Sequence, residues 1–334
     1  MNNKEGYGNA LEDFNLQNTQ FIQTPTLEPL GKKVGMYQPG LIRHIAKERP
    51  DIVFIFANPR FLSTWTTIIA ARIFGCKVYG HGHGLYKRKN ISTVTRILWN
   101  AMFSILTKYI CYTPFIRDGF ISFGFNPEKL VIAANSEVNE YPISPSERSL
   151  DNYDILFIGR LRADSYLPIL IKSIESIRDT HTIPINLHVI GDGVQMDDLI
   201  ILQKKHPWVK LYGKIYDKEK IRDISKSCIA GCYPGNAGLS ILHMMSLSLP
   251  PITHDNLYSH GPEVSYIRHD VNGLLFDHKN PEDSLKKTIL SLLESKTKLA
   301  SLQEGAYSSY QELINPSLAE RFDKVFSDPH YVGD

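Results

Sequence analysis

The sequence predicts an α/β protein in which parallel strands alternate with helices. Short apolar runs that end in glycine, polar or turn residues recur along the chain, and helical patterns lie between them. The chain has 334 residues, about the length of two domains, and its 43% apolar composition is enough for packed cores. We therefore expect two facing Rossmann-like domains with a ligand cleft at the carboxyl ends of their strands.

The first half of the chain predicts an N-terminal domain over residues 1–140. Its elements are read from apolar runs and from apolar residues at helical spacing. We expect strands at 21–24, 51–57, 76–80, 109–113 and 129–135, and helices at 40–49, 61–74, 93–107 and 115–123. The polar, proline-containing segment 136–152 is the natural linker to the second domain.

The second half predicts a C-terminal domain over residues 150–334, and its last helix is placed to pack back on the N-terminal domain. We expect strands at 153–159, 185–193, 209–213, 228–233, 250–254 and 272–276. Helical patterns separate them, as in PEDSLKKTILSLLES, where Leu285, Ile289 and Leu292 share one face. This alternation is typical of a doubly wound domain.

Charge and cysteine content exclude several classes of protein. Lys plus Arg is 37 against 35 for Asp plus Glu, so the net charge of +2 gives no case for a nucleic-acid partner. The 4 cysteines lack the spacing of a zinc site or a disulfide framework, and we expect them reduced and buried: Cys76, Cys111, Cys228 and Cys232. No apolar run reaches the length of a membrane span, which indicates a cytoplasmic protein.

Three strand ends of the second half carry residues suited to a phosphorylated ligand. In FIGRLRADS, Arg160 and Arg162 follow a strand, where a guanidinium can clamp a diphosphate or can be a solvated loop cation. The glycine turn VIGDG and the loop GKIYD (213–217) follow two further strands, and ordinary βα loops explain each of them taken alone.

The stretch PGNAGLSILHMMSLSLPPIT, 234–253, predicts a helix that opens on Gly235, Asn236, Ala237 and Gly238 and stops before a double proline. Free N–H groups at a helix start carry partial positive charge, and small residues let an anion approach them closely. A phosphate is therefore the expected ligand of this stretch.

A histidine pair and a glutamate are further candidates. GHGHG at 80–84 follows an expected strand, and it fits a histidine facing a ligand, a tight loop or, less well, a metal site. Glu263, in GPEVSYI, is expected to place a favourable charge at a helix start.

The order and spacing of these elements resemble family-four glycosyltransferases of the glycosyltransferase-B fold. The resemblance spans about Pro39 to Glu294, and it includes the strand ending in GR, the strand ending in GDG, the glycine turn before PPIT, and GPEVSYIRHDVNGLLF. It is most like bacterial enzymes that build capsule, O-antigen or other surface polysaccharide. The resemblance implies two Rossmann-like domains and a nucleotide-diphosphate sugar as donor substrate, with no cofactor and no metal.

What the resemblance implies for single residues is mixed. Gly159 and Arg160 fall at the diphosphate position, Arg162 is a substitute for a lysine that is missing at Ser165, and Ile215 lies in the loop that meets the base. The family's two glutamates correspond to Gly235 and His243, so this chain lacks both carboxylates. The resemblance then implies that His243 hydrogen-bonds the ribose in place of the second glutamate. Backbone N–H groups of Asn236, Gly238 and Leu239 remain for the phosphate, and register favours His83 over His81 beside the donor sugar.

The function expected from this resemblance is a retaining, metal-independent glycosyltransferase that extends a lipid-linked bacterial glycan at the cytoplasmic face of the membrane. The stretch 87–108 combines basic residues with an apolar helix. This stretch can contact the membrane surface peripherally, or its helix can pack into the core of the N-terminal domain. A non-catalytic sugar-nucleotide-binding remnant or partner subunit is the alternative function, and an epimerase is a weaker one. The polar start MNNKEGYGNALEDFNLQNTQF lacks the expected first strand, so we expect an incomplete N-terminal domain, from an internal start or a degraded copy.

Overall fold

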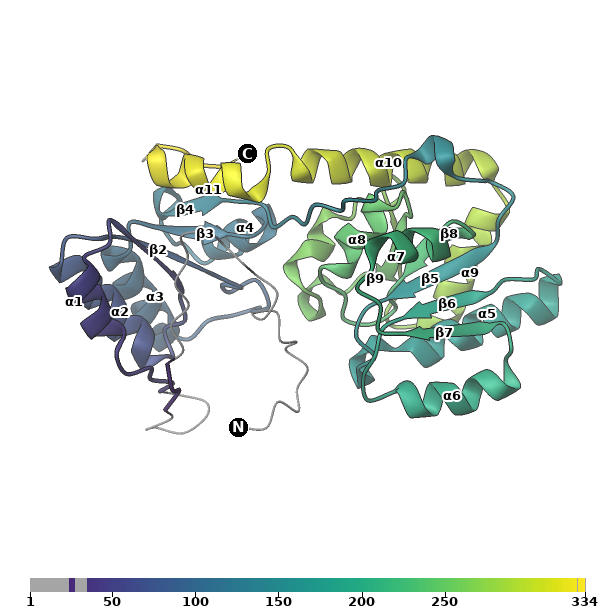
Figure 1. Ribbon diagram of the computed structural model, residues 1–334, viewed down its shortest axis with the longest axis horizontal. Coiled ribbons are helices and arrows are strands. Elements are labelled where there is room, and N and C mark those ends of the chain that lie inside the picture. Colours follow the sequence, from purple (N-terminus) through teal and green to yellow (C-terminus); the bar gives the residue numbers. More distant parts are fainter. Residues whose placement is uncertain (1–23, 28–34, 329, 334) are drawn as a thin grey trace. The chain divides into compact units, whose positions relative to one another are not determined.

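The computed structural model describes residues 24–27, 35–328 and 330–333 (Figure 1). The polar start and nearly all of the expected strand at 21–24 lie outside these residues. The chain divides into two compact units, one of residues 1–82 and 92–109 and one of residues 83–91 and 110–334.

The first unit is built on two parallel neighbouring strands and three helices. The elements are α1 (Leu41–Glu48), β1 (Ile52–Phe56), α2 (Leu62–Ile73), β2 (Lys77–Gly82) and α3 (Thr93–Ile105). Ile52 pairs with Lys77 and Phe56 with His81, which fixes the register. Ile68 and Met102 are fully buried, so α2 and α3 each turn an apolar side toward the core of this unit.

The second unit contains a six-stranded sheet in the order β10–β9–β8–β5–β6–β7, and all its neighbouring strands are parallel. Its strands are β5 (Asp154–Ile158), β6 (Leu187–Ile190), β7 (Val209–Gly213), β8 (Cys228–Cys232), β9 (Pro251–His254) and β10 (Leu274–Phe276). The chain runs outward from β5 to β7 on one side and from β8 to β10 on the other. The strand order therefore reverses between β5 and β8, the place where doubly wound sheets bind ligands.

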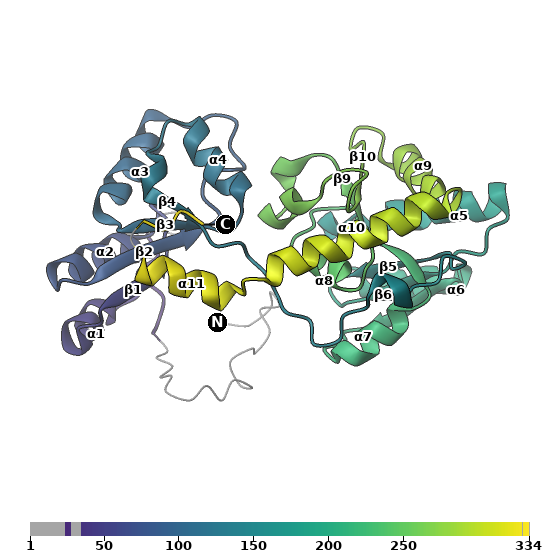
Figure 2. The ribbon, with the colours of Figure 1, turned by 90° about the horizontal axis from the view of Figure 1, so that it is seen from above.

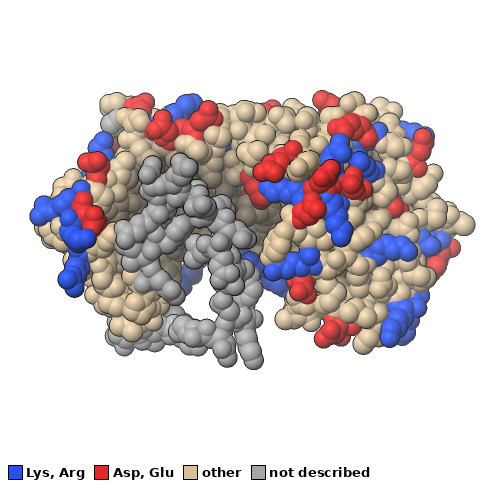
Figure 3. Space-filling view, in the orientation of Figure 1, with Lys and Arg blue, Asp and Glu red and all other residues tan. Residues whose placement is uncertain are grey.

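Helices of the second unit cover both faces of this sheet, as Figures 1 and 2 show for α5 and α7 on opposite sides. The helices of this unit after β5 are α5 (Leu167–His181), α6 (Met196–Lys205), α7 (Lys218–Ser225), α8 (Ser240–Ser246), α9 (Pro281–Leu293), α10 (Lys296–Ile314) and α11 (Leu318–Ser327). The short helices η1 (Pro127–Lys129) and η2 (Pro145–Glu147) precede β5, and η3 (Ala163–Ser165), η4 (Leu257–Ser259) and η5 (Pro262–Tyr266) follow it. On the face seen in Figure 3, basic and acidic side chains are interspersed over these elements.

The second unit also includes β3 from Ile110 onward (β3 is Lys108–Cys111), α4 (Pro114–Ser122) and β4 (Leu130–Ile132). The N–H of Ala133 donates to the carbonyl of Cys111 at 3.1 Å, so the segments after β3 and β4 run together. The N–H of Ile132 donates to the carbonyl of Val332 at 3.2 Å, which ties the end of the chain to β4.

The expected mixed α/β architecture with parallel strands is confirmed, and one helix start is wrong. Residues 235, 236 and 238 form bends, and α8 begins only at Ser240. The N–H of Asn236 donates to the carbonyl of Asp164 at 3.0 Å and that of Ala237 to Nδ1 of His260 at 3.1 Å, which holds the turn out of helical geometry. The four cysteines are free and buried, as expected.

Candidate functional site

The glycine turns that follow β5 and β6 touch each other through their backbones. Gly159 and Gly191 both have φ +149°, and a Cβ on Gly191 would lie 1.8 Å from the carbonyl oxygen of Gly159. A Cβ on Gly193 would lie 2.6 Å from the carbonyl oxygen of Leu161. Because a side chain at either position would displace the neighbouring backbone, this close approach requires both glycines of GDG, whereas a Cβ on Gly159 of GR would lie 2.7 Å from the ring of Tyr233.

The two arginines after β5 have different surroundings. Arg160 is exposed, and its carbonyl accepts a hydrogen bond from the hydroxyl of Tyr233 at 3.2 Å. Arg162 pairs with Asp164 at 3.2 Å and donates to the carbonyl of Asn236 at 3.3 Å. Arg162 therefore joins the turn after β5 to the loop after β8, and these two segments flank the point where the strand order reverses.

The loop after β8 offers two backbone donors. The N–H of Asn236, expected to face a phosphate, is occupied by Asp164, whereas the N–H groups of Gly238 and Leu239 have no acceptor among the residues that the structure describes. A Cβ on Gly238 would meet only Oε2 of Glu263, at 3.7 Å. The remaining donors are the two expected N–H groups nearest to α8, and the place of Asn236 in a donor site stays a prediction.

Two of the positions at which the family resemblance expects a charged side chain, Gly235 and Ser165, could not carry one in this backbone. A Cβ on Gly235 would lie 1.9 Å from the carbonyl oxygen of Asp164, so the missing glutamate has no room there. Ser165 is fully buried, and its hydroxyl donates to Oε1 of Gln195 at 2.6 Å. The close packing around Gly235 and Ser165 therefore leaves no room for a charged side chain at either position.

His243 and Ile215 lie on other sides of this loop. Nε2 of His243 is buried and has no hydrogen-bond partner among the residues that the structure describes. Burial lowers the pKa of His243, and the smaller effects of Glu137, which raises it, and of Lys218, which lowers it, act in opposite directions. Ile215 is partly buried and packs against the core of the six-stranded domain. Contact of either residue with a nucleotide stays a prediction.

The segment 83–91 is bonded to the loop after β9. The hydroxyl of Tyr86 donates to the carbonyl of His260 at 2.7 Å, and Nζ of Lys87 donates to the carbonyl of Ser259 at 3.3 Å. His83 sits at the start of this segment; desolvation lowers its pKa, and the nearby carboxylate of Glu263 raises it. His81, by contrast, lies in β2 and stacks on Phe54 with ring centroids 4.3 Å apart.

A pair of buried histidines supports the loop after β8, and sequence reasoning did not single it out. The ring centroids of His254 and His260 are 3.9 Å apart, and the ring planes are tilted by 31°. Nδ1 of His260 accepts the N–H of Ala237, so the opposite nitrogen, Nε2, carries the proton that it shares with the carbonyl of His254 at 2.9 Å. Burial lowers the pKa of His254 to about 4 and that of His260 to about 3, so both rings are neutral near pH 7.

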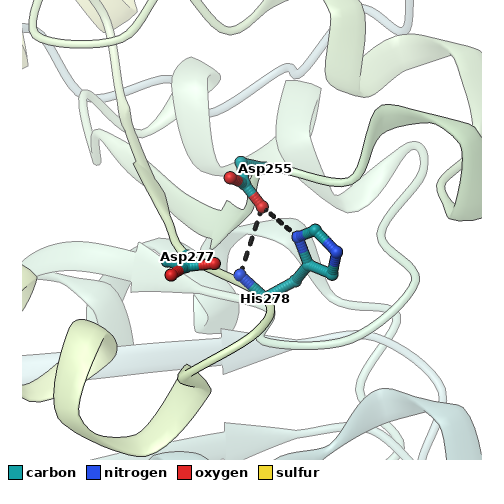
Figure 4. A group of neighbouring side chains, drawn as sticks. All are labelled: Asp255, Asp277 and His278. Carbon is teal, nitrogen blue, oxygen red and sulfur yellow. Dashed lines mark hydrogen bonds and ion pairs between the residues drawn. The ribbon is translucent and has the colours of Figure 1, made fainter.

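A cavity of about 310 Å³ lies behind this pair, bordered by Asn236, His254, Phe276 and His278. At its edge, Asp255, Asp277 and His278 place ligand atoms within 4.8 Å of one another (Figure 4). All three side chains are exposed, and Oδ1 of Asp255 already accepts hydrogen bonds from Nδ1 of His278 at 2.6 Å and from its N–H at 3.1 Å. An ordinary surface ion pair accounts for these contacts, and we assign no ion to them.

Glu263 is the functional candidate whose surroundings sequence reasoning missed. It lies at the expected helix start, in η5, but its side chain is only 5% exposed and makes no hydrogen bond that caps its own helix. Its Oε1 accepts a hydrogen bond from Nδ2 of Asn135 at 2.9 Å. No local pattern in GPEVSYI distinguishes this buried carboxylate from a solvated one.

Comparisons with known proteins agree with this geometry. The family Glycosyl transferases group 1 matches residues 143–309, and Glycosyltransferase Family 4 matches residues 8–136. The two matched ranges meet inside the expected linker, and the domain boundaries themselves stay a prediction. A search of the curated proteins finds no match.

Several solved structures share the fold at low sequence identity. Anabaena HepE in complex with UDP is 17% identical, with a TM-score of 0.66, over 87% of this chain and 82% of that one. The lipopolysaccharide outer core galactosyltransferase WaaB is 16% identical, with a TM-score of 0.56, over 82% and 78%. Sucrose-phosphate synthase from Thermosynechococcus elongatus is 14% identical, with a TM-score of 0.62, over 85% and 75%. The chain belongs to the group 1 glycosyltransferases and has the glycosyltransferase-B fold.

Proposed function

We propose that the protein is a retaining glycosyltransferase that moves a sugar from a nucleotide-diphosphate donor to a growing, lipid-linked bacterial glycan. The arrangement around the β5–β8 reversal supports this most directly. Arg160 follows one strand, and the N–H groups of Gly238 and Leu239, which lack an acceptor among the described residues, follow the other. A diphosphate supplies both the negative charge and the acceptor oxygens that this arrangement suits.

In this proposal the residues around the reversal have separate tasks. Arg160, beside Gly159, binds the diphosphate, and Arg162 holds the two flanking segments together. The loop that contains Ile215 meets the base, and His243 contacts the ribose. His83 lies beside the reacting carbon, where a neutral imidazole can hold a sugar hydroxyl.

The proposed reaction relies on electrostatic stabilisation of the leaving group. The bond between the anomeric carbon and the phosphate oxygen breaks, and the charge on the departing diphosphate grows in the transition state. A fixed guanidinium and two backbone N–H groups stabilise that charge more in the transition state than in the bound donor. The leaving phosphate then takes the proton of the acceptor hydroxyl, which forms the new glycosidic bond on the same face. This step needs no metal ion and no cofactor.

A lipid-linked acceptor and peripheral membrane contact belong to the same proposal. WaaB is described as a lipopolysaccharide outer core galactosyltransferase, which is the class of glycan that we infer for this chain. No helix among the described residues has the length and apolar character of a membrane span. In α3, Val94 is 66% and Ile97 59% exposed, and the basic run 87–89 precedes them in the chain. Such a segment suits the surface of an anionic bilayer.

Substitution of Arg160 tests the proposed role of the diphosphate site. Arg160→Lys keeps the charge but loses the bidentate fork, and Arg160→Ala loses both. We expect donor turnover to fall in that order, with a loss of several kcal/mol of transition-state stabilisation in the alanine variant. The measurement is release of nucleoside diphosphate from a panel of UDP-, GDP-, ADP- and CDP-sugars with bacterial lipid extract as acceptor. Equal turnover in the three proteins would remove Arg160 from the site.

The same assay separates the enzyme from a non-catalytic sugar-nucleotide-binding protein. The absence of a carboxylate at Gly235 favours that second candidate, because the family resemblance assigns a sugar contact to this position. A wild-type protein that binds a sugar nucleotide in calorimetry, yet neither hydrolyses nor transfers the sugar, would support the binding protein. Turnover that depends on Arg160 would support the enzyme.

A further inference from the structure

Glu263 is a buried carboxylate with very little to neutralise it. Its side chain is 5% exposed, and within the described residues it forms no ion pair with a lysine, arginine or histidine. The single hydrogen bond that it makes within the described part of the chain joins Oε1 to Nδ2 of Asn135. Glutamates are rarely buried unless they are paired, because leaving a charge in a low-dielectric site is costly. A second partner is therefore expected for this carboxylate.

The second oxygen of Glu263 points at the glycine turn in front of α8. A Cβ on Gly238 would lie 3.7 Å from Oε2, and a Cβ on Gly261 would lie 2.7 Å from it. The absence of side chains at these two glycines leaves the approach to Oε2 open beside the N–H group of Gly238. Oε2 receives no hydrogen bond from the described residues.

Other groups of the candidate site lie around the same carboxylate. Desolvation lowers the pKa of His83 and of Lys87 and raises that of Tyr112, and the negative charge of Glu263 acts on all three pKa values in the upward direction. The hydrogen bond from Tyr86 to the carbonyl of His260 holds the segment of His83 next to the loop that leads into η5. Glu263 therefore belongs to the same cluster as the residue that we place beside the donor sugar.

We propose that Oε2 of Glu263 accepts a hydrogen bond from a hydroxyl of the donor's sugar, in place of the carboxylate for which Gly235 has no room. This inference rests on the proposed function, because it needs a nucleotide-diphosphate sugar in the β5–β8 site. Asn135 fixes Oε1, so that the free oxygen is held toward the turn. Hydrogen bonds to a charged acceptor are stronger than neutral ones, which suits a group that selects the sugar.

The test compares binding of a nucleotide with binding of the corresponding sugar nucleotide in wild type and in Glu263→Gln. Glutamine keeps the acceptor for Asn135, but it replaces the charged Oε2 with an oxygen or nitrogen of a neutral amide. Calorimetry with UDP and UDP-glucose comes first, followed by UDP-galactose, UDP-N-acetylglucosamine, GDP-mannose and ADP-glucose with their nucleoside diphosphates. We expect affinity for the preferred sugar nucleotide to fall about tenfold or more, and affinity for the nucleoside diphosphate to stay within about twofold.

A matched control is Glu282→Gln, because Glu282 also follows a proline at a helix start but is exposed. If Glu263 served only as a helix-start charge, the two variants would behave alike, with a small loss of melting temperature and unchanged binding. Asn135→Ala removes the donor to Oε1. If Glu263 served only to hold Asn135, Glu263→Gln would keep wild-type melting temperature and sugar-nucleotide affinity, because glutamine still offers an acceptor, and only Asn135→Ala would lose them.

The outcomes separate this inference from the proposed function. Wild-type protein that binds none of the nucleoside diphosphates or sugar nucleotides overturns the proposed function. Wild-type protein that binds nucleoside diphosphates, while Glu263→Gln retains wild-type affinity for the preferred sugar nucleotide, overturns only the role of Glu263. Wild-type protein that binds nucleoside diphosphates but no sugar nucleotide overturns both the proposed function and the role of Glu263. Loss of the carboxylate in Glu263→Gln should lower the pKa of His83, which NMR can measure. An unchanged pKa of His83 in this variant would also overturn the inferred cluster.

Discussion

Two glycines in the turn before α8 should respond very differently to a single added methyl group. A Cβ on Gly235 would lie 1.9 Å from the carbonyl oxygen of Asp164 and 2.6 Å from the carbonyl carbon of Ser165. A Cβ on Gly238 would meet only Oε2 of Glu263, at an ordinary contact distance of 3.7 Å. We therefore predict that Gly235→Ala is strongly destabilising and that Gly238→Ala is nearly neutral.

The expected cost of Gly235→Ala can be assembled from the contacts that it breaks. To relieve the overlap, the turn must move away from Asp164 by on the order of 1 Å. That movement breaks the hydrogen bonds from N–H and from Nδ2 of Asn236 to Asp164, both 3.0 Å long, at about 1 kcal/mol each. Overpacking of the neighbouring backbone adds about 1–3 kcal/mol. The free energy of unfolding should thus fall by about 3–5 kcal/mol, whereas Gly238→Ala should change it by about 0.5 kcal/mol.

Fluorescence of Trp208 during urea unfolding measures this difference in the second unit. Trp208 is 9% exposed and belongs to the core of the six-stranded domain, and Trp65→Phe with Trp99→Phe removes the other two tryptophans. Both glycine variants carry the same entropic effect of Gly→Ala on the unfolded chain, so their comparison cancels it. Unfolding midpoints of Gly235→Ala and Gly238→Ala that correspond to free energies within about 1 kcal/mol of each other would refute the steric argument.

Two further predictions concern pH and membranes. The folded pKa values of His254 and His260, about 4 and about 3, lie below the unfolded value of about 6.5, so stability is complete above pH 6.5 and falls as the pH drops toward the folded values. Between pH 6 and pH 4.5, His260→Gln should reduce the pH dependence of the free energy of unfolding, measured with urea, by about 1.4 kcal/mol per pH unit. An equal pH dependence in wild type and variant would contradict this prediction. Arg88→Glu with Lys89→Glu should weaken co-sedimentation with anionic vesicles at least about tenfold, and Lys204→Glu with Lys205→Glu should not. Equal binding of both pairs would remove the basic run from any membrane contact.

The order of strands and helices could be predicted because buried parallel strands carry dense apolar runs. DIVFIFA and YDILFIG gave β1 and β5 to within one or two residues. The start of α8 could not be predicted, because it depends on hydrogen bonds between Asn236 and Asp164 and between Ala237 and His260. Such bonds join segments that lie far apart in the sequence, and local helix signals take no account of them.

The buried polar residues show the same limit. Arg148 looks like part of a polar linker, yet it is 8% exposed and donates from Nε to the carbonyl of Leu247 at 2.9 Å and from a terminal nitrogen to the carbonyl of Cys228 at 3.1 Å. Burial lowers the pKa of this guanidinium to about 10. Its role is to satisfy backbone carbonyls near α8 and β8. Composition and spacing cannot identify that role, because the carbonyls that need a donor are defined only by the fold.

The glycine turn lacks a carboxylate in its sequence motif, yet in the fold a carboxylate from elsewhere in the chain faces the same turn. Counted along the sequence, Gly235 marks a lost glutamate, and the loss alone would indicate a degraded site. In the fold, the same backbone that excludes a side chain at Gly235 brings Oε2 of Glu263 to within 3.7 Å of the Cβ position of Gly238, in the same turn. A carboxylate therefore faces the turn from another loop. Activity consequently depends on which groups face the glycine turn in the fold. A position-by-position sequence alignment does not identify these groups.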